Sequence, residues 1–331
     1  MIDRRIVSII ASRLIITAGI IITAACAAIR PSQIKADLPE ETAQSREERT
    51  VKALAAAYPL RIEKAEFIND DWAVLMDGVW YYYAGGKMLP EKLREQAEKY
   101  SGAYDIPNYP AELPPWTEPT PEQVERYRGR NTGNNANNRN NNSGNTEERP
   151  RAQPRSNHFS EALWQAASRS EASQRMQNVN FFGYTISVHS GIVGVLDGVK
   201  ERITAAAKVD PRAQSWISDI GEVYGWNWRN IAASQSRSNH SYGIAVDILP
   251  KSLNGKETYW LWAAQKGKEW WNVPYEDRYH PPDAVIKAFE AYGFIWGGKW
   301  IIFDTMHFEY RPEVLIFNGF EIATATTPTD A

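Results

Sequence analysis

The sequence has a single cysteine in 331 residues, which excludes an intramolecular disulfide and any cysteine-rich zinc site. A bound metal ion would therefore have to be held by His, Asp and Glu side chains. An excess of positive charge is also lacking, because 37 basic side chains stand against 40 acidic ones. This balance argues against a nucleic-acid-binding protein, which usually shows a clear basic excess. Hydrophobic residues make up 43% of the chain, enough for one sizeable domain with additional segments.

The N-terminus lacks an apolar run long enough to be an unambiguous membrane span. The stretch from Leu14 to Ala28 is about 15 residues long, whereas a spanning helix needs roughly 20. With arginines before this stretch and small residues at its end, residues 1–28 have the layout of a secretory signal peptide. Ala-Ala-Cys at Cys26 also resembles the end of a bacterial lipoprotein box, although Thr23 stands where leucine is usual.

A cleaved signal, a lipid anchor at Cys26 and an uncleaved membrane anchor all predict export of the chain. The protein is then expected in the periplasm or attached to the cell envelope, as a lipoprotein if Cys26 carries the lipid. A cytosolic protein with an unusual start is the fourth interpretation.

Residues 29–104 predict a small N-terminal segment. Asp77-Gly78 separates two runs rich in aromatic and β-branched residues, 71–76 and 79–83, and this arrangement is typical of a β-hairpin. A proline then opens a short predicted helix over residues 91–100.

Residues 105–157 are predicted to be a linker. Six prolines fall between Pro107 and Pro121, and nine asparagines fall between Asn131 and Asn145. Neither stretch has enough apolar surface to offset its loss of chain entropy, so we expect an extended and then disordered chain. The domain that follows is expected to fold without it, unless the aromatic hairpin needs a surface of that domain to cover it.

Residues 158–318 predict an α+β domain, followed by a tail over 319–331. Apolar residues at helical spacing and β-branched runs indicate helices over 192–203 and 285–292 and strands over 185–188, 244–249 and 300–303. These elements do not alternate as strand, helix and strand. We therefore expect a small antiparallel sheet flanked by helices.

Two motifs in this domain contain residues suited to metal binding. The first runs from Ser238 to Asp247 and includes His240, and the second runs from Asp304 to Tyr310 and includes His307. On one straight strand His240 and Asp247 would lie roughly 23 Å apart, whereas two ligands of one zinc ion place their donor atoms about 3 to 4 Å apart. His240 must therefore come from a turn that folds back over the strand, and the glycine three residues later supplies the backbone freedom for it.

Read together, the motifs resemble a family of zinc peptidases. This family includes the D-alanyl-D-alanine carboxypeptidases of the vancomycin-resistance type and the L-alanyl-D-glutamate endopeptidases of phage lysins. The matching pattern is Ser-x-His-x-x-Gly-x-Ala-x-Asp followed later by acid-x-x-His. An arginine eleven residues before His240 and the run Gly293–Trp300 are similar to the endopeptidase branch. The resemblance covers roughly residues 180–315.

The resemblance implies a catalytic zinc site. His240, Asp247 and His307 would be the three protein ligands, which leaves a fourth position for water. Asp304 would be the general base, and Arg229 would hold the substrate carboxylate or the developing oxyanion. A neighbouring acid or a backbone carbonyl could instead hold Arg229 in a structural role.

Three further side chains are expected to contact substrate or to keep a ligand in place. Ser238 is expected to orient a loop or a ligand. Glu309 would share a strand face with His307 and form an ion pair or a supporting hydrogen bond. Trp296 fits a core position as well as a substrate contact. The remaining histidines are interpreted as structural: His158, His189 and His280.

The implied function is that of a zinc-dependent peptidase acting on the peptide stems of peptidoglycan. Both carboxypeptidase and endopeptidase cleavage fit, and aspartate at position 304 favours the endopeptidase. The expected partner is a peptidoglycan peptide, with no nucleic acid and with membrane contact only through the N-terminal anchor. The alternative is a domain of the same fold whose zinc site binds cell-wall material or protein without hydrolysis. The presence of Asp304 argues against it, because a purely structural site needs no base.

Overall fold

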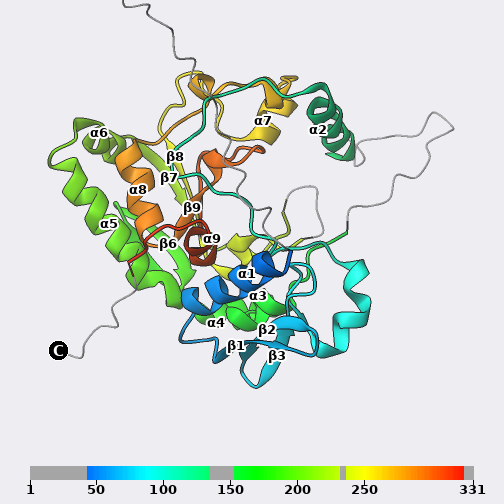
Figure 1. Ribbon diagram of the computed structural model, residues 1–331. Helices are drawn as coiled ribbons and strands as arrows, with labels where there is room; N and C mark the ends of the chain where they lie inside the picture. Colours follow the sequence, from blue (N-terminus) through cyan, green and yellow to red (C-terminus); the bar gives the residue numbers. More distant parts are fainter. Residues whose placement is uncertain (1–42, 135–152, 232–235, 324–331) are drawn as a thin grey trace, which may run out of the picture. The chain divides into compact units, whose positions relative to one another are not determined.

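The computed structural model describes residues 43–134, 153–231 and 236–323 (Figure 1). The predicted signal or anchor over 1–28, including Cys26, lies outside these residues, as does the asparagine-rich part of the predicted linker from 135 to 152. Within the described ranges, no helix combines the length and apolar character needed to cross a membrane.

The first part of the described chain forms a helix and a four-stranded sheet in the order β1-β2-β3-β4. Its elements are α1 (Ala43–Ala57), β1 (Lys64–Ile68), β2 (Asp71–Met76), β3 (Val79–Tyr82), β4 (Leu89–Pro90) and the 3-10 helix η1 (Glu91–Lys99). The predicted hairpin is confirmed as β2 and β3. Asp77 and Gly78 have φ angles of 51° and 72°, and two positive values in succession are what a tight hairpin turn requires.

The second part contains helices and two antiparallel sheets, β5-β6 and β7-β8-β10-β9. The helices are α2 (Pro121–Asn134), α3 (His158–Leu163), α4 (Arg169–Arg175), α5 (Val193–Ala207), α6 (Pro211–Asp219), α7 (Trp260–Gln265), α8 (Asp283–Ala291) and α9 (Pro312–Phe317). The 3-10 helices are η3 (Ser190–Ile192), η4 (Asn239–Tyr242), η5 (Trp270–Asn272), η6 (Tyr275–Asp277) and η7 (Gly297–Lys299). The strands are β5 (Met176–Phe181), β6 (Tyr184–His189), β7 (Ile220–Tyr224), β8 (Ala245–Pro250), β9 (Phe294–Trp296) and β10 (His307–Tyr310).

Helix α8 packs against the four-stranded sheet of the second part, and α5 lies beside α8 in Figure 1. Both helices bury the apolar face that the sequence spacing predicted. The ring of Phe289 from α8 stacks on Phe308 of β10 with centroids 3.9 Å apart, so the helix packs directly against the strand that carries His307. Mixed helices and antiparallel sheets confirm the α+β fold.

The strand predicted over residues 300–303 is wrong. These residues follow η7 in an irregular loop, in which Ile301 is 64% exposed. The loop is fixed at Gly297, whose carbonyl accepts a hydrogen bond from the Asp304 N–H at 3.1 Å. A Cβ atom at Gly297 would come within 2.5 Å of the Asp304 carbonyl oxygen. The apolar run therefore turns back on itself, and the strand begins only at His307.

The segment 105–134 also differs from the predicted linker. Ile106 and Tyr109 are 0% and 4% exposed, and residues 121–134 form α2, from which Tyr127 packs on the ring of Trp270 at 5.1 Å. Prolines restrict the unfolded chain, so an extended proline-rich segment loses little further entropy when a few aromatic side chains are buried. Composition alone did not reveal that the burial of a few aromatic side chains would offset the entropy lost when this segment is ordered.

The N-terminal segment and the region from His158 share one hydrophobic core. Tyr81 packs edge-on against Phe159 with centroids 5.4 Å apart, and Tyr58 packs against Trp164 at 5.7 Å. Helices α1 and α9 also lie side by side (Figure 1). The hairpin is therefore covered by the region that carries the candidate metal ligands. This is the case in which that region is not expected to fold independently.

We predict that the two halves of the chain stay associated after cleavage between them. A site-specific protease sequence inserted within residues 135–152 would allow the backbone to be cut while the shared apolar core remains buried. The cut protein should elute from gel filtration with the uncut protein and should separate only in denaturant. Two folded pieces that elute separately under native conditions would contradict a shared core.

Candidate metal centre

Three candidate metal ligands converge on one point from η4, β8 and β10. Strand pairing sets two of them, because His307 lies directly opposite Asp247 in the β10 and β8 register, and opposed residues of antiparallel strands project on the same side. His240 comes from η4, the turn that the sequence required. This turn ends at Gly243 with a φ of 69°, where an added Cβ would lie 2.7 Å from the His189 backbone nitrogen.

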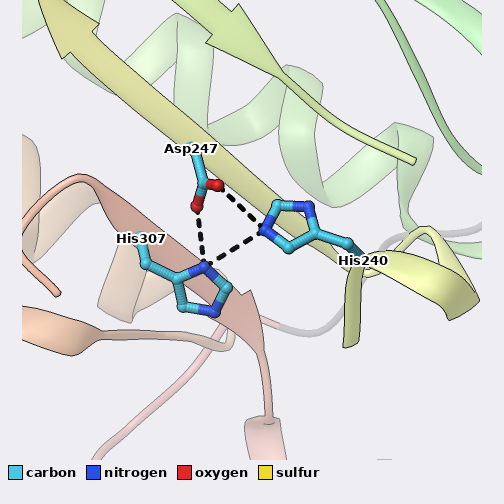
Figure 2. A group of neighbouring side chains, drawn as sticks. All are labelled: His240, Asp247 and His307. Carbon is cyan, nitrogen blue, oxygen red and sulfur yellow. Dashed lines mark hydrogen bonds and ion pairs between the residues drawn. The ribbon is translucent and has the colours of Figure 1, made fainter. Parts of the chain in front are cut away.

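The candidate ligand atoms are close together and face one another, as Figure 2 shows. His240 Nε2 lies 3.1 Å from Asp247 Oδ2 and 3.3 Å from His307 Nδ1. His307 Nδ1 lies 2.7 Å from Asp247 Oδ1. Two ligands bound tetrahedrally at about 2.1 Å would be about 3.4 Å apart. The three donor atoms therefore match a zinc site after only small adjustments.

Hydrogen bonds on the far side of each imidazole determine which nitrogen faces the centre. His240 Nδ1 lies 2.7 Å from the Gly225 carbonyl oxygen, which can only accept, so Nδ1 carries the proton. His307 Nε2 lies 3.1 Å from Glu309 Oε2 and donates to this carboxylate. His240 Nε2 thus directs its lone pair at the centre, and His307 Nδ1, which lies 2.7 Å from Asp247 Oδ1, would do the same once a cation replaced its proton.

The charges around the centre also indicate a place for a cation. Burial would raise the pKa of Asp247, but His240 and His307 outweigh it and hold this pKa well below its usual range. Burial disfavours a charged His307, yet hydrogen bonds to Asp247 and Glu309 raise its pKa well above 6.5. Burial is likewise outweighed at Glu309, where His307 and Arg311 lower the pKa to about 2. The surrounding carboxylates therefore favour positive charge at the centre.

Asp304, the expected base, lies beside the centre without being one of the three ligands. Its Oδ1 is shielded from solvent and has no hydrogen-bond partner among the described residues. Burial, together with the negative charges of Asp247 and Glu309, raises the pKa of Asp304 to about 7, although His307 and Arg229 act in the opposite direction. A carboxylate in this state can accept a proton near neutral pH.

Arg229 is exposed, and its charge reaches the same site. Its backbone N–H donates to Ser241 Oγ at 2.8 Å. Its guanidinium donates a long 3.4 Å hydrogen bond to the Asn230 carbonyl, a backbone partner of the kind that the structural alternative named. No ion pair joins Arg229 to any carboxylate in the described ranges, so the structural role in which an acid would hold it gains no support. The guanidinium is close enough to lower the pKa of Asp304.

The three supporting residues have different surroundings. Ser238 Oγ accepts a hydrogen bond from the His240 N–H at 3.4 Å and caps η4, so it orients the loop. Glu309 binds His307 Nε2, as its position on the same strand face predicted. Trp296 is 1% exposed and donates to the Thr305 carbonyl at 2.8 Å, so direct contact with substrate is not available to it. It supports the loop between Asp304 and His307 instead.

The other histidines have no part in the centre. His189 is buried between the Trp164 carbonyl and the Gly191 N–H, and the ring of His280 packs edge-on against Trp296 at 4.8 Å. His158 is exposed and lies 4.0 Å from Glu161. These surroundings are those expected of structural residues.

Sequence reasoning missed two groups that hold the ligands. Asn239 Nδ2 donates to Glu309 Oε2 at 2.8 Å, which fixes the carboxylate that orients His307. Its place beside His240 in the first motif was a usable signal. The Gly225 carbonyl orients His240, but every residue has a carbonyl, so no sequence signal could have identified it.

We predict that His307→Ala abolishes stoichiometric zinc binding and lowers the thermal unfolding midpoint. The substitution removes one of three ligands drawn from separate elements, so metal binding and folding stability are lost together. Elemental analysis and thermal unfolding measure the two effects, with His158→Ala as the control that should change neither. One zinc ion per chain in His307→Ala would refute the ligand assignment.

We predict that Glu309→Gln weakens zinc binding by about 10- to 100-fold while retaining the fold, because the neutral amide supports the imidazole less than a carboxylate does. Competition with a chelator of known affinity measures the change. Glu201→Gln on the exposed side of α5 is the matched control. Equal affinities in the two variants would contradict a supporting role for Glu309.

Two segments of the chain match known families. Residues 50–105 match the model of a domain of unknown function, and residues 232–310 match the model described as D-alanyl-D-alanine carboxypeptidase, a family of zinc peptidases. No solved structure matches the chain. The family match confirms the resemblance that the two motifs carried. Residues 232–310, which match the model described as D-alanyl-D-alanine carboxypeptidase, thus contain all three candidate ligands and Asp304.

Proposed function

We propose that this protein is a zinc-dependent peptidase that hydrolyses amide bonds in the peptide stems of peptidoglycan. The observation that carries the proposal is the convergence of His240, Asp247 and His307, with one nitrogen of each imidazole facing the same carboxylate. The family match supplies the substrate class, since its description names a D-alanyl-D-alanine bond. A site with three protein ligands and a neighbouring unpaired carboxylate is suited to catalysis rather than to a purely structural role.

Each residue of the site is assigned its own role in hydrolysis. His240, Asp247 and His307 would hold a zinc ion, which when bound would lower the pKa of water and polarise a carbonyl group. Asp304 accepts the proton of the attacking water at its unpaired carboxylate and passes it to the leaving amine. Arg229, exposed and unpaired with any described acid, holds a substrate carboxylate or the oxyanion that develops on the carbonyl oxygen.

Two bonds of the peptide stem are candidates for cleavage. The description of the matched family names carboxypeptidase cleavage, whereas aspartate at position 304 is the acid found in the endopeptidases that the sequence resembles. Digestion of purified peptidoglycan, followed by mass identification of the products, distinguishes them. Release of single D-alanine indicates a carboxypeptidase, and a new D-glutamate N-terminus indicates an endopeptidase. Binding of the wall material without any released fragment would overturn the proposal in favour of a non-catalytic module.

Export of the protein is part of the same proposal. Peptidoglycan lies outside the cytoplasm, and the basic, apolar and small-residue order of residues 1–28 supports a secretory signal or an anchor, with Cys26 as the lipidation site if the lipoprotein interpretation holds. Cell fractionation combined with mass analysis of the mature N-terminus tests it. A cytoplasmic full-length chain would contradict it.

We predict that Asp304→Ala keeps zinc and the fold while slowing hydrolysis by about 10²- to 10⁴-fold, the usual contribution of general acid-base catalysis. Asp304 is the proposed base but not a ligand, so the zinc content should remain one per chain. The release of stem-peptide fragments is measured at saturating substrate. Asp197→Asn, on the exposed side of α5, is the control. Cleavage by Asp304→Ala at the wild-type rate would show that another group is the base.

A further inference from the structure

A second polar pocket lies behind the metal centre, between the N-terminal segment and the peptidase region. Arg155, Arg237 and Arg311 line it, together with Ser156, Tyr242 and the ring of Tyr104. These residues come from the approach to α3, from η4 and its flanks, from the start of α9 and from the segment before α2. No step of the proposed hydrolysis uses these residues.

Three polar groups that line this pocket lack a hydrogen-bond partner among the described residues. They are Tyr242 OH, Ser156 Oγ and Arg237 Nε, all shielded from solvent. Tyr242 and Ser156 are each only 2% exposed. Buried polar groups are nearly always paired in folded proteins, and an unpaired one lowers stability. Each of the three can donate a hydrogen, so together they suit a ligand that only accepts.

The charge of the pocket favours an anion. Arg311 is neutralised by ion pairs with Glu313 and Glu309. Arg237 has its nearest acid, Glu161, at 4.0 Å. Arg155 has no carboxylate within ion-pair distance in the described part of the chain. Arg155, whose side chain is exposed, is thus the arginine of this pocket that has no paired acid among the described residues, and its planar guanidinium suits a single carboxylate.

The pocket is connected to the metal centre by hydrogen bonds. Asn239 lines the pocket and donates to Glu309 Oε2 at 2.8 Å, and the same oxygen accepts from His307 Nε2. Arg311 contacts the other oxygen of Glu309 at 3.8 Å. We propose that this pocket is a carboxylate-binding site, with one wall supplied by Tyr58, Ala103 and Tyr104 of the N-terminal segment. This gives residues 50–105 a role in ligand binding.

Acetate is the probe for the pocket, titrated into the zinc-loaded full-length protein at constant ionic strength, with chloride as the reference anion. A ligand that binds only the folded state raises the thermal unfolding midpoint in proportion to its concentration over Kd. We expect acetate to raise the midpoint. We expect Tyr242→Phe and Arg155→Gln each to weaken the apparent affinity at least tenfold, and Arg212→Gln, an exposed arginine of α6, to leave it unchanged.

The Tyr242 variant separates binding from a structural role. Because its hydroxyl has no partner, Tyr242→Phe should leave the midpoint without acetate unchanged or raise it. A lower midpoint without acetate, together with unchanged acetate affinity, would overturn the proposal. So would equal effects of acetate and chloride, or stabilisation by inorganic phosphate alone. Acetate binding requires no hydrolysis, so the result stands apart from the test of Asp304.

The source of the carboxylate is decided by two peptides. A stem peptide with free carboxyl groups and the same peptide with amidated carboxyl groups are compared in the Asp304→Ala variant, which is expected to bind without cleaving. If the free acid alone stabilises the protein, and Tyr242→Phe removes the difference, the pocket recognises the substrate. If acetate binds but the two peptides do not differ, it takes a small free carboxylate instead.

Discussion

The peptidase region is arranged around one constraint: the donor atoms of His240, Asp247 and His307 lie together and require a positive charge between them. Two imidazole nitrogens and a carboxylate face one another, because the Gly225 carbonyl and Glu309 hold the ring protons on the far side. Neighbouring secondary-structure elements position the three candidate ligands. The β8 and β10 pairing fixes two ligands, and the turn at Gly243 brings in the third. Without a metal ion, a proton on His307 has to supply the positive charge that balances the buried carboxylates.

The candidate ligand set came from the family resemblance that the two short motifs carried. The straight-strand distance between His240 and Asp247 already required a turn, and the structure has this turn as η4. The register that places His307 opposite Asp247 was not predictable from periodicity, because 60 residues separate the two positions. The family resemblance supplied that pairing. The role of the Gly225 carbonyl could not be predicted from the sequence, since this group belongs to the backbone.

Predictions from composition and from apolar runs were weaker. Residues 300–303 are apolar and β-branched enough to resemble a strand, but a close backbone approach at Gly297 makes them a loop. The proline-rich stretch looked unable to fold, yet a few aromatic side chains such as Tyr109 find buried positions on distant parts of the chain. The two errors have different causes: the partner of Tyr109 lies more than a hundred residues away in the chain, whereas residues 300–303 are decided by one close backbone contact nearby.

The contact between α1 and α9 has a consequence for the order of folding. Tyr58, at the end of α1, donates a buried 2.7 Å hydrogen bond to Glu313, which lies 255 positions later in the chain. Contacts at such separation form late, because a long loop must close before they contribute. The N-terminal segment therefore cannot complete its core while the chain is still emerging from the ribosome. It must wait for the last helix, so this segment reaches its full stability only after synthesis is finished.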